Sequence, residues 1–299
     1  MAVELDVDAD VEVDVRPATP TRTAPQPNRD RLPWGRWLLI GLVVGWFAIL
    51  VLVPSLALVR AALAGGFRPF LNALAAPSAR EAFRLTLLIT VLATVVNTVF
   101  GLALAIVLAR QNFWGKTLAD GVVDLPFAIS PIVAGLMLII LYGGKGWIGQ
   151  WLEPMGIQVV YALPGMVLAT TFVTLPFVVR EVVPVLREFG VDQEEAAYTL
   201  GASRWRTFWS VTLPSIRWGL AYGVTLTVAR SLGEFGALLV VSGNILGRTQ
   251  TATLYVHDGI ESFDIEGAYA ASVLLAGVSF VMLIGMEQFR KRVEAREES

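Results

Sequence analysis

The chain has 299 residues, of which 55% are hydrophobic and 16% charged, and its mean hydropathy is +0.64. This composition is too apolar for a soluble globular protein and indicates a protein of the lipid bilayer. There are no cysteines, which excludes a disulfide framework and a thiolate metal site. The formal net charge of −2 says little about partners, because the acidic residues are concentrated in the first fourteen positions.

Residues 1–33 are expected to form a disordered cytoplasmic tail that is first acidic and then rich in Pro and Arg. Six carboxylates among the first fourteen residues repel one another and disfavour pairing as a strand. The segment lacks a basic region followed by a small-residue cleavage site, so it is not expected to be a cleaved signal peptide. The rest of the chain divides into a membrane domain, residues 34–289, and a charged cytoplasmic C-terminus, residues 290–299.

Six apolar runs follow the tail, each near the roughly 20 residues that a helix needs to cross about 30 Å of hydrocarbon. Two runs contain proline pairs, Pro126 with Pro131 and Pro164 with Pro176. Such breaks are tolerated where neighbouring protein satisfies the freed carbonyls, so both runs are predicted to face protein. The pattern predicts an all-α integral membrane protein with six transmembrane helices, at residues 37–59, 85–109, 122–142, 159–179, 219–241 and 268–286.

The distribution of Lys and Arg predicts the orientation of these helices. With a cytoplasmic N-terminus, the inside segments hold 16 basic residues and the outside segments six. This bias favours both termini in the cytoplasm, and it puts the polar segment between the fourth and fifth helices on the same side. The inside positions are Arg16, Arg22, Arg29, Arg31, Arg36, Arg110, Lys116, Arg180, Arg187, Arg204, Arg206, Arg217, Arg290, Lys291, Arg292 and Arg296, and the outside positions are Arg60, Arg68, Arg80, Arg84, Lys145 and Arg248.

That polar segment, residues 180–214, is predicted to fold as a helical hairpin. Asp192 and Glu195 stand three residues apart and can form a capping box at the start of a first short helix. Gly201 can take the left-handed conformation that ends this helix, and Ser203 can cap a second one. Pro214 is expected to stop the second helix.

The same segment carries a recognisable spacing of acidic, small and apolar residues. The positions are Glu195, Ala196, Ala197, Gly201, Val211, Leu213 and Pro214. The two adjacent alanines leave a helix face low enough for close approach by another protein, to which Glu195 offers a carboxylate. The spacing resembles the EAA loop of permease subunits in bacterial ABC importers. The resemblance implies that the hairpin docks into a cleft of a cytoplasmic ATPase and carries its closure to the membrane helices; the alternative is an ordinary capped loop.

Two charged residues interrupt the fifth apolar run. A charge near a helix centre costs about 2.5–3.5 kcal/mol on an insertion scale, so Arg230 and Glu234 are not expected to face lipid. Four residues apart, they share one helix face and could form a structural clasp. Alternatively, the pair lines the route of an anionic solute, with Ser231, Gly233 and Gly236 leaving backbone donors accessible. The sequence leaves both interpretations open.

No catalytic or metal-binding constellation is predicted. His257 lies in an expected outside loop and has no second His or Cys with which to share a metal. The Gly-Lys pairs at 115–116 and 144–145 lack the upstream glycine of a P-loop, so energy must come from a partner. An intramembrane enzyme using Asp124, Arg230 and Glu234 is the alternative class, but it lacks a Ser/His or His/Glu pair.

Five longer stretches extend the family resemblance over most of residues 34–286: LPFAISPIVAGL, REVVPVLREFG, TLGAS, VTLPSIRWGLAYG and ARSLGEFGALLVVSG. They resemble the sulfate/thiosulfate-type permease subunits of bacterial ABC importers, in particular the subunit that pairs with a second, related permease. Ser231 departs from the pattern, in which Ala is usual. Molybdate/tungstate-type permeases share the GEFGA and EAA signatures and remain the alternative.

The resemblance also implies a location, partners and a mechanism. The chain is expected to be a multi-pass protein of the bacterial inner membrane, without a cofactor of its own and without a nucleic-acid partner. Besides membrane lipid, the expected partners are a second permease (related or a second copy), two cytoplasmic ATPase subunits that bind ATP and Mg, and a periplasmic anion-binding protein. Alternating access driven by the ATPases would carry the anion between the two permeases.

Overall fold

The computed structural model describes residues 33–297, and every regular element in that part of the chain is a helix. The predicted tail therefore lies almost entirely outside the described residues. The chain divides into two units, one ending at Pro54 and one beginning at Ser55, which are described separately. The all-α class predicted from the apolar runs is confirmed for the described residues.

The first apolar stretch consists of α1 (Pro33–Phe47), the π-helical η1 (Ala48–Leu52) and α2 (Val53–Ala62). In η1 the amide of Val53, the residue before Pro54, donates to the carbonyl of Ala48 five residues earlier. A proline ring clashes with the carbonyl four residues before it, and a wider π turn at this point accommodates the ring without ending the helix.

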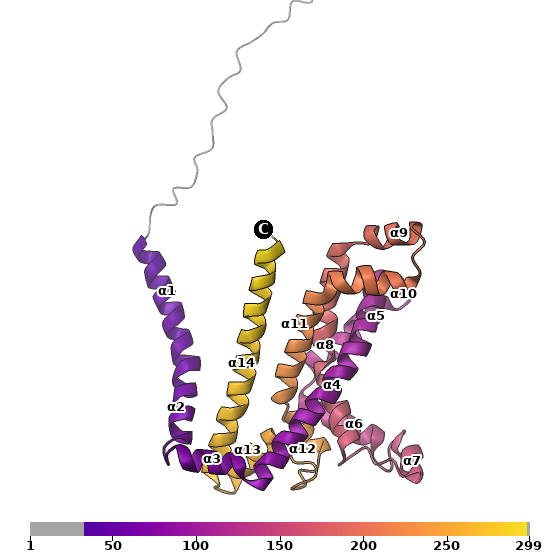
Figure 1. The fold of residues 1–299 in the computed structure, drawn as a ribbon. Helices are drawn as coiled ribbons and strands as arrows, with labels where there is room; N and C mark the ends of the chain where they lie inside the picture. Colours follow the sequence, from indigo (N-terminus) through magenta and orange to yellow (C-terminus); the bar gives the residue numbers. More distant parts are fainter. Residues whose placement is uncertain (1–32, 298–299) are drawn as a thin grey trace, which may run out of the picture. The chain divides into compact units, whose positions relative to one another are not determined.

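The second unit contains the remaining helices (Figure 1): α3 (Phe67–Ala75), α4 (Pro77–Arg110), α5 (Lys116–Ala128), α6 (Pro131–Tyr142), α7 (Gly149–Leu152), η2 (Glu153–Met155), α8 (Leu163–Phe189), α9 (Asp192–Thr199), α10 (Arg204–Thr207), η3 (Phe208–Thr212), α11 (Leu213–Leu232), α12 (Gly236–Val241), α13 (Ala252–Glu261) and α14 (Ile265–Glu297). Within this unit, α9, α10 and the C-terminal end of α14 lie at one end, and α3, α7 and α13 lie at the other.

The core of this unit is built where α4, α8 and α11 pack against one another. Val178 of α8 sits between glycines of the two neighbouring helices. A Cβ on Gly101 of α4 would lie 3.1 Å from the Val178 Cβ, and one on Gly223 of α11 would lie 3.0 Å from its Cα. Glycine is therefore required at Gly223, because the backbones of α8 and α11 leave no room for a side chain.

Four helical segments of the described chain are long and apolar enough to cross a membrane, namely residues 34–62, α4, α8 and α14. The bent pair of α5 and α6 makes a fifth if it counts as one span. The chain direction bends by 113° between these two helices. The remaining predicted crossing corresponds to α11 and α12. Helix α11, which carries Arg217 and Arg230, is not among the described helices that are long and apolar enough to cross a membrane.

The helix breaks differ from those expected of the sequence. The third run breaks before Pro131, as its prolines predict, but α8 runs unbroken from Leu163 with Pro164 in its first turn and Pro176 buried inside it.

More than half of the most apolar window of α8 is buried, so the prediction that this run faces protein is confirmed. In α5 and α6 only four residues are buried, so most of the third run is exposed or only partly buried in the single chain.

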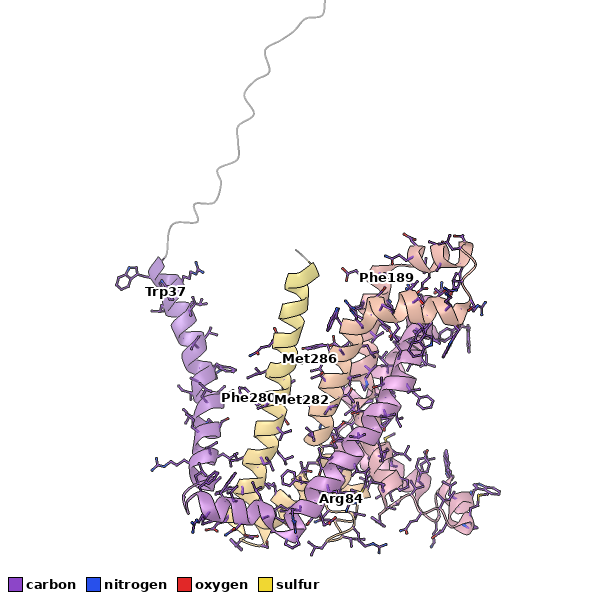
Figure 2. The ribbon with its side chains drawn as sticks, in the orientation of Figure 1. Trp37, Arg84, Phe189, Phe280, Met282 and Met286 are labelled. Atoms are coloured by element: carbon purple, nitrogen blue, oxygen red, sulfur yellow. The ribbon has the colours of Figure 1, made fainter. Side chains whose placement is uncertain are left out.

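The side chains of α14 show the opposite behaviour to those of α8. Only 11% of its most apolar window is buried inside the chain, and Phe280, which Figure 2 labels together with Met282 and Met286, is 65% exposed. An apolar helix with so little internal packing is suited to lipid or to another membrane subunit.

Candidate functional site

The segment after α8 folds as α9, a tight turn and α10, and glycines in the left-handed region stand at both ends of α9. Gly190 precedes the helix with φ 69° and Gly201 follows it with φ 83°. The amide of Ala202 donates to the carbonyl of Ala197 at 3.0 Å, and that of Gly201 donates to Tyr198 at 2.9 Å, which together form a Schellman motif. A Cβ on Gly201 would meet no atom within 4 Å, so its backbone conformation alone requires glycine. The predicted cap at Gly201 is confirmed.

The predicted capping box is wrong. The residue before α9 is Val191, whose side chain caps nothing, and Asp192 already lies inside the helix. A capping box needs the acidic residue at the position before the first helical residue, and here it stands one position too late. Asp192 and Glu195 still place carboxylates in the first turn, where the helix dipole favours them. Ser203 does cap α10, accepting from the amide of Arg206 at 3.3 Å.

Pro214 does not stop the second helix of the hairpin, contrary to expectation. Helix α10, the π turn η3 and α11 follow one another without a break from Arg204 to Leu232. The amide of Leu213 donates to the carbonyl of Phe208, five residues back, directly before the proline. This is the arrangement found before Pro54, and it lets the helix pass through proline. The second hairpin helix is therefore the beginning of the fifth apolar run.

A glutamate that the sequence did not single out fastens α9 to the rest of the unit. Glu194 Oε1 lies 3.0 Å from Nη2 of Arg110 at the end of α4, and it accepts a hydrogen bond from the hydroxyl of Thr212 at 2.9 Å. Nη1 of Arg110 donates to the carbonyl of Leu186 in α8 at 2.9 Å. The only feature of the sequence that pointed to this junction was Arg110, a basic residue at the end of the second apolar run.

The other side of α9 is exposed. Glu195 and Ala196 lie on the surface, Ala197 is half-buried, and the carboxylate of Glu195 makes no ion pair with any side chain described between residues 33 and 288. Two apolar side chains beside them are also exposed, Leu200 to 88% and Trp205 to 72%. The structure thus separates two neighbouring glutamates, one bound inside the chain and one available to a partner.

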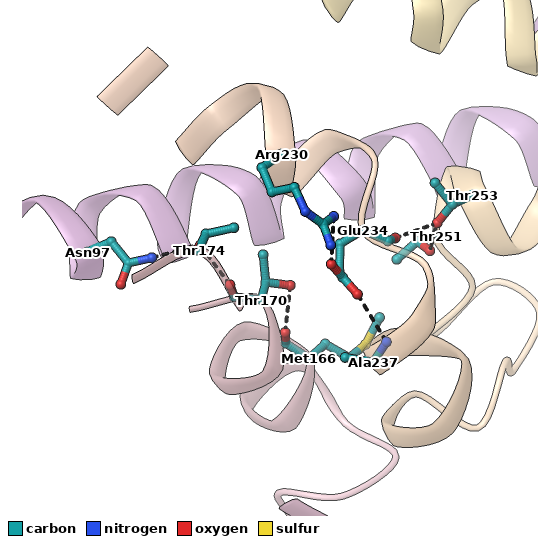
Figure 3. A network of polar contacts seen from close by, with 9 residues as sticks. All are labelled: Asn97, Met166, Thr170, Thr174, Arg230, Glu234, Ala237, Thr251 and Thr253. Carbon is teal, nitrogen blue, oxygen red and sulfur yellow. Dashed lines mark hydrogen bonds and ion pairs between the residues drawn. The ribbon is translucent and has the colours of Figure 1, made fainter. Parts of the chain in front are cut away.

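The charged pair of the fifth run lies where its helix breaks. Helix α11 ends at Leu232, and Glu234 stands in the short non-helical link before α12, so the predicted continuous helix 219–241 is wrong. Glu234 is 1% exposed and its Oε2 lies 2.8 Å from Nη1 of Arg230 (Figure 3). Its Oε1 accepts from the amide of Ala237 at 3.0 Å, and its carbonyl accepts from the hydroxyl of Thr253 at 2.7 Å. The predicted pairing is confirmed.

Arg230 is bound on one side only. Its side chain is 34% exposed, whereas that of Glu234 is fully buried. Within the described chain Glu234 is the one ion-pair partner of the guanidinium, which has five N–H donors in a fixed fork. A buried carboxylate therefore holds an arginine whose remaining donors can bind an oxyanion.

The neighbouring candidates fall into different environments. Ser231 is 3% exposed, and its buried hydroxyl finds no hydrogen-bond partner among the described residues. Gly233 is exposed and has open space around it, as expected of an accessible backbone. Gly236 packs instead on α6, where a Cβ would lie 3.0 Å from the Cβ of Pro131. The glycine there serves close packing.

A buried polar stripe on α4 runs beside this break and was not predicted. Thr86, Thr90, Thr94 and Asn97 recur at helical spacing and are at most 9% exposed. Thr86 accepts from the amide of Ala252 at 2.8 Å, and Asn97 donates to the hydroxyl of Thr174 at 2.7 Å. The hydroxyls of Thr90 and Thr94 have no partner within the described residues. The spacing of the three threonines was readable in the sequence.

Asp124, which the enzyme alternative would need beside Arg230, is held elsewhere. Arg180 of α8 binds both of its carboxylate oxygens, at 2.7 and 2.6 Å, and also reaches Asp120 at 2.9 Å. These contacts fasten α5 to α8 through a bidentate pair.

His257 lies in helix α13 and not in a loop, which corrects the expectation. Its nitrogens are 3.7 Å from Asp258 and 3.5 Å from Glu261, and the three residues together could hold a cation. Asp258, however, already accepts hydrogen bonds from Asn244 and Gln250, the latter at 2.6 Å. The three residues are partly exposed, and the carboxylate of Asp258 binds side chains of the loop before α13.

Residues 97–295 match the model of a family described as the inner membrane component of binding-protein-dependent transport systems. The chain belongs to this family. It is therefore an inner membrane component of a transport system.

Curated relatives match over nearly their whole length. The chain is 49% identical over 257 residues to a sulfate transport system permease protein, CysW, of Synechocystis sp., covering 86% of this chain and 93% of that protein. It is 43% identical to CysW of Escherichia coli, with coverage of 88% and 91%, and 37% identical to CysT of the same organism, with coverage of 90% and 97%. These relatives are named as permeases and not as enzymes.

A solved structure shares the fold. A bacterial alginate ABC transporter, crystallised in complex with a periplasmic protein bound to an alginate pentasaccharide, contains a chain that superposes with a TM-score of 0.72. The identity is 19%, and the match covers 87% of this chain and 95% of that one.

Proposed function

We propose that this permease carries sulfate, and thiosulfate by the same route, as one half of the membrane channel of an ATP-driven importer. The observation that carries the proposal is the 43–50% identity to named sulfate transport permeases over more than four-fifths of the chain. A non-catalytic role agrees with the binding of Asp124 by Arg180, which keeps that carboxylate away from the Arg230–Glu234 pair.

Arg230 is the residue that we assign to the anion. Its fork can donate two parallel hydrogen bonds to neighbouring oxygens of a tetrahedral oxyanion. Glu234 orients the guanidinium and compensates its charge, so that the anion meets a site of low net charge and can leave it again. Ser231, Gly233 and Gly236 then shape the helix break around the pair.

The expected topology is six crossings with both termini in the cytoplasm, where α11 with α12 and α5 with α6 each count as one crossing. The common end of α14 and the hairpin supports placing the C-terminus and the hairpin on one side. Because the chain has no cysteine, single cysteines at Arg68, Lys145 and Arg248 should react with an impermeant thiol reagent from outside. Cysteines at Lys116 and Arg204 should not, and reversed labelling would contradict this topology.

The hairpin is proposed to be the contact with the ATPase. The exposed Glu195, Ala196 and Leu200 support a docking face, and the unbroken helix from Arg204 to Leu232 supports transmission toward Arg230. Two cytoplasmic ATPase subunits would bind ATP and Mg, a second permease such as a CysT-like chain would complete the channel, and a periplasmic protein would deliver the anion. Closure of the ATPases would switch the permeases between inward-open and outward-open states.

The test is uptake of labelled sulfate by the reconstituted complex, with and without competing thiosulfate, molybdate or tungstate. We expect ATP-dependent uptake that thiosulfate inhibits and that molybdate leaves nearly unchanged. Uptake of molybdate in preference to sulfate would establish the alternative anion. Activity of the purified chain alone, without an ATPase subunit, would contradict a transporter subunit altogether.

A further inference from the structure

The contacts of Glu194 converge on a single carboxylate oxygen. Oε1 lies 3.0 Å from Nη2 of Arg110 and 2.9 Å from the hydroxyl of Thr212, while Arg110 also donates to the carbonyl of Leu186. These four residues come from α9, the end of α4, η3 and α8. One carboxylate therefore links α9 directly to α4 and to η3, which continues into α11, and through Arg110 to α8.

Burial makes this junction stiff. The side chains of Glu194 and Arg110 are 13% and 15% exposed, and Thr212 is 6% exposed. An ion pair that is largely shielded from water is screened little by salt, and removing one partner leaves the other charged and unpaired. The partners are 84 residues apart in the chain, so the pair fixes tertiary structure and does not belong to one helix.

The two adjacent glutamates of α9 lie in different environments. Glu195 is exposed and has no ion-pair partner within residues 33–288, whereas Glu194 is largely buried and binds Arg110 and Thr212 through Oε1. A force applied by a partner at the exposed face of α9 would therefore pass through Glu194 to Arg110 and Thr212.

We propose that Glu194 and Arg110 are the positioning residues that transmit movement of the hairpin to the channel, so that without them ATP hydrolysis and transport become uncoupled. The inference rests on the proposed function, since it assigns the coupling of that transporter to an internal ion pair. The hairpin helix α10 continues into α11, and α8 is joined to α9 along the chain by Gly190 and Val191, but α4 receives the movement of α9 through this pair.

The experiment uses the complete complex with its ATPase and binding protein, carrying Glu194→Gln or Arg110→Met. We expect assembly with the ATPase and basal hydrolysis within about twofold of wild type, because neither residue is on the docking face. Stimulation of hydrolysis by the anion-loaded binding protein should disappear, and sulfate uptake should fall at least about tenfold. Arg110→Lys, which keeps the charge, should retain more stimulation than Arg110→Met.

The matched control is Glu188→Gln, an exposed carboxylate at the end of α8 that has no ion-pair partner among the described residues. It should behave as wild type. Stimulated hydrolysis and uptake at wild-type levels in Glu194→Gln would overturn the inference. Should Glu194→Gln fail to assemble, Thr212→Val is measured in its place, and unchanged stimulation there overturns the inference. Failure of the wild-type complex to import sulfate would instead refute the proposed function.

Discussion

Two carboxylates of this permease are each bound by an arginine, but the two pairs differ in their separation along the chain and in their exposure. Glu194 meets Arg110 across 84 residues at 3.0 Å, and Glu234 meets Arg230 across four residues at 2.8 Å. Arg110 is almost fully buried and is bound to two elements, whereas Arg230 keeps one-third of its side chain exposed. Both side chains of the first pair are largely shielded from water, whereas the guanidinium of the second pair is partly accessible. We therefore assign the first pair to a structural junction and the second to the proposed anion site, although the chemistry of the two pairs is the same.

The largest effect is expected from removing only the buried member of the second pair. Glu234→Leu leaves Arg230 without its ion-pair partner and the amide of Ala237 without its acceptor. Breaking a fully buried pair costs about 3–5 kcal/mol, and the partial exposure of Arg230 lowers that cost. The complex should lose most of its folded permease, measured as the yield of assembled complex after detergent extraction. Full assembly of this single variant would show that Arg230 does not depend on Glu234.

A smaller but still large effect is expected at the hairpin. Gly201→Val forces a β-branched residue into the left-handed region, which costs about 1–3 kcal/mol without any steric contact. The ATPase should no longer co-purify, while the membrane helices stay packed. The control is Gly247→Val, at a glycine with φ 70° and no neighbouring atoms, which should leave ATPase binding intact. Equal behaviour of the two variants would contradict the assignment of the hairpin to the ATPase.

Arg230→Lys should spare assembly and reduce transport. The substitution keeps the charge and loses the planar fork, and a hydrogen bond to a charged group is worth about 1.5–3 kcal/mol. Sulfate uptake should fall about tenfold to a hundredfold with ATPase binding unchanged. Uptake equal to wild type would mean that only the charge matters, as in a clasp.

The smallest effect is expected from Ser231→Ala. The hydroxyl is buried and has no partner among the described residues, so its removal should change uptake by less than about twofold and raise thermal stability slightly. A tenfold loss of uptake would instead place this hydroxyl in contact with the anion.

What the sequence predicted correctly is local along the chain. The left-handed cap at Gly201, the serine cap at Ser203 and the pairing of Arg230 with Glu234 all depend on residues within five positions of one another. Local rules also gave two wrong predictions. Pro214 fails to end a helix because a π turn precedes it, and Asp192 fails as a cap because α9 starts one residue earlier than its capping pattern requires.

The remaining features depend on contacts between distant segments. Asn97 and Thr174 meet because α4 packs against α8, and Arg110 meets Glu194 because the end of α4 lies beside α9. The spacing in the sequence singles out Glu195, and nothing in it predicts that Glu194 is the glutamate bound inside the chain. The break at Gly233 to Phe235 likewise depends on Glu234, which turns into the interior to bind Ala237 and Arg230. Burial and partner choice at such positions are properties of the packed structure.

The measurement that tests the central claim most directly is sulfate uptake by the complex carrying Arg230→Met together with Glu234→Leu. Replacing both members of a buried pair by apolar residues of similar size is often neutral or stabilising for a fold, so the complex should assemble and bind its ATPase. We predict an assembled complex that hydrolyses ATP weakly and imports no sulfate. Near-normal uptake would show that the pair is only a clasp and would contradict the assignment of Arg230 to the anion.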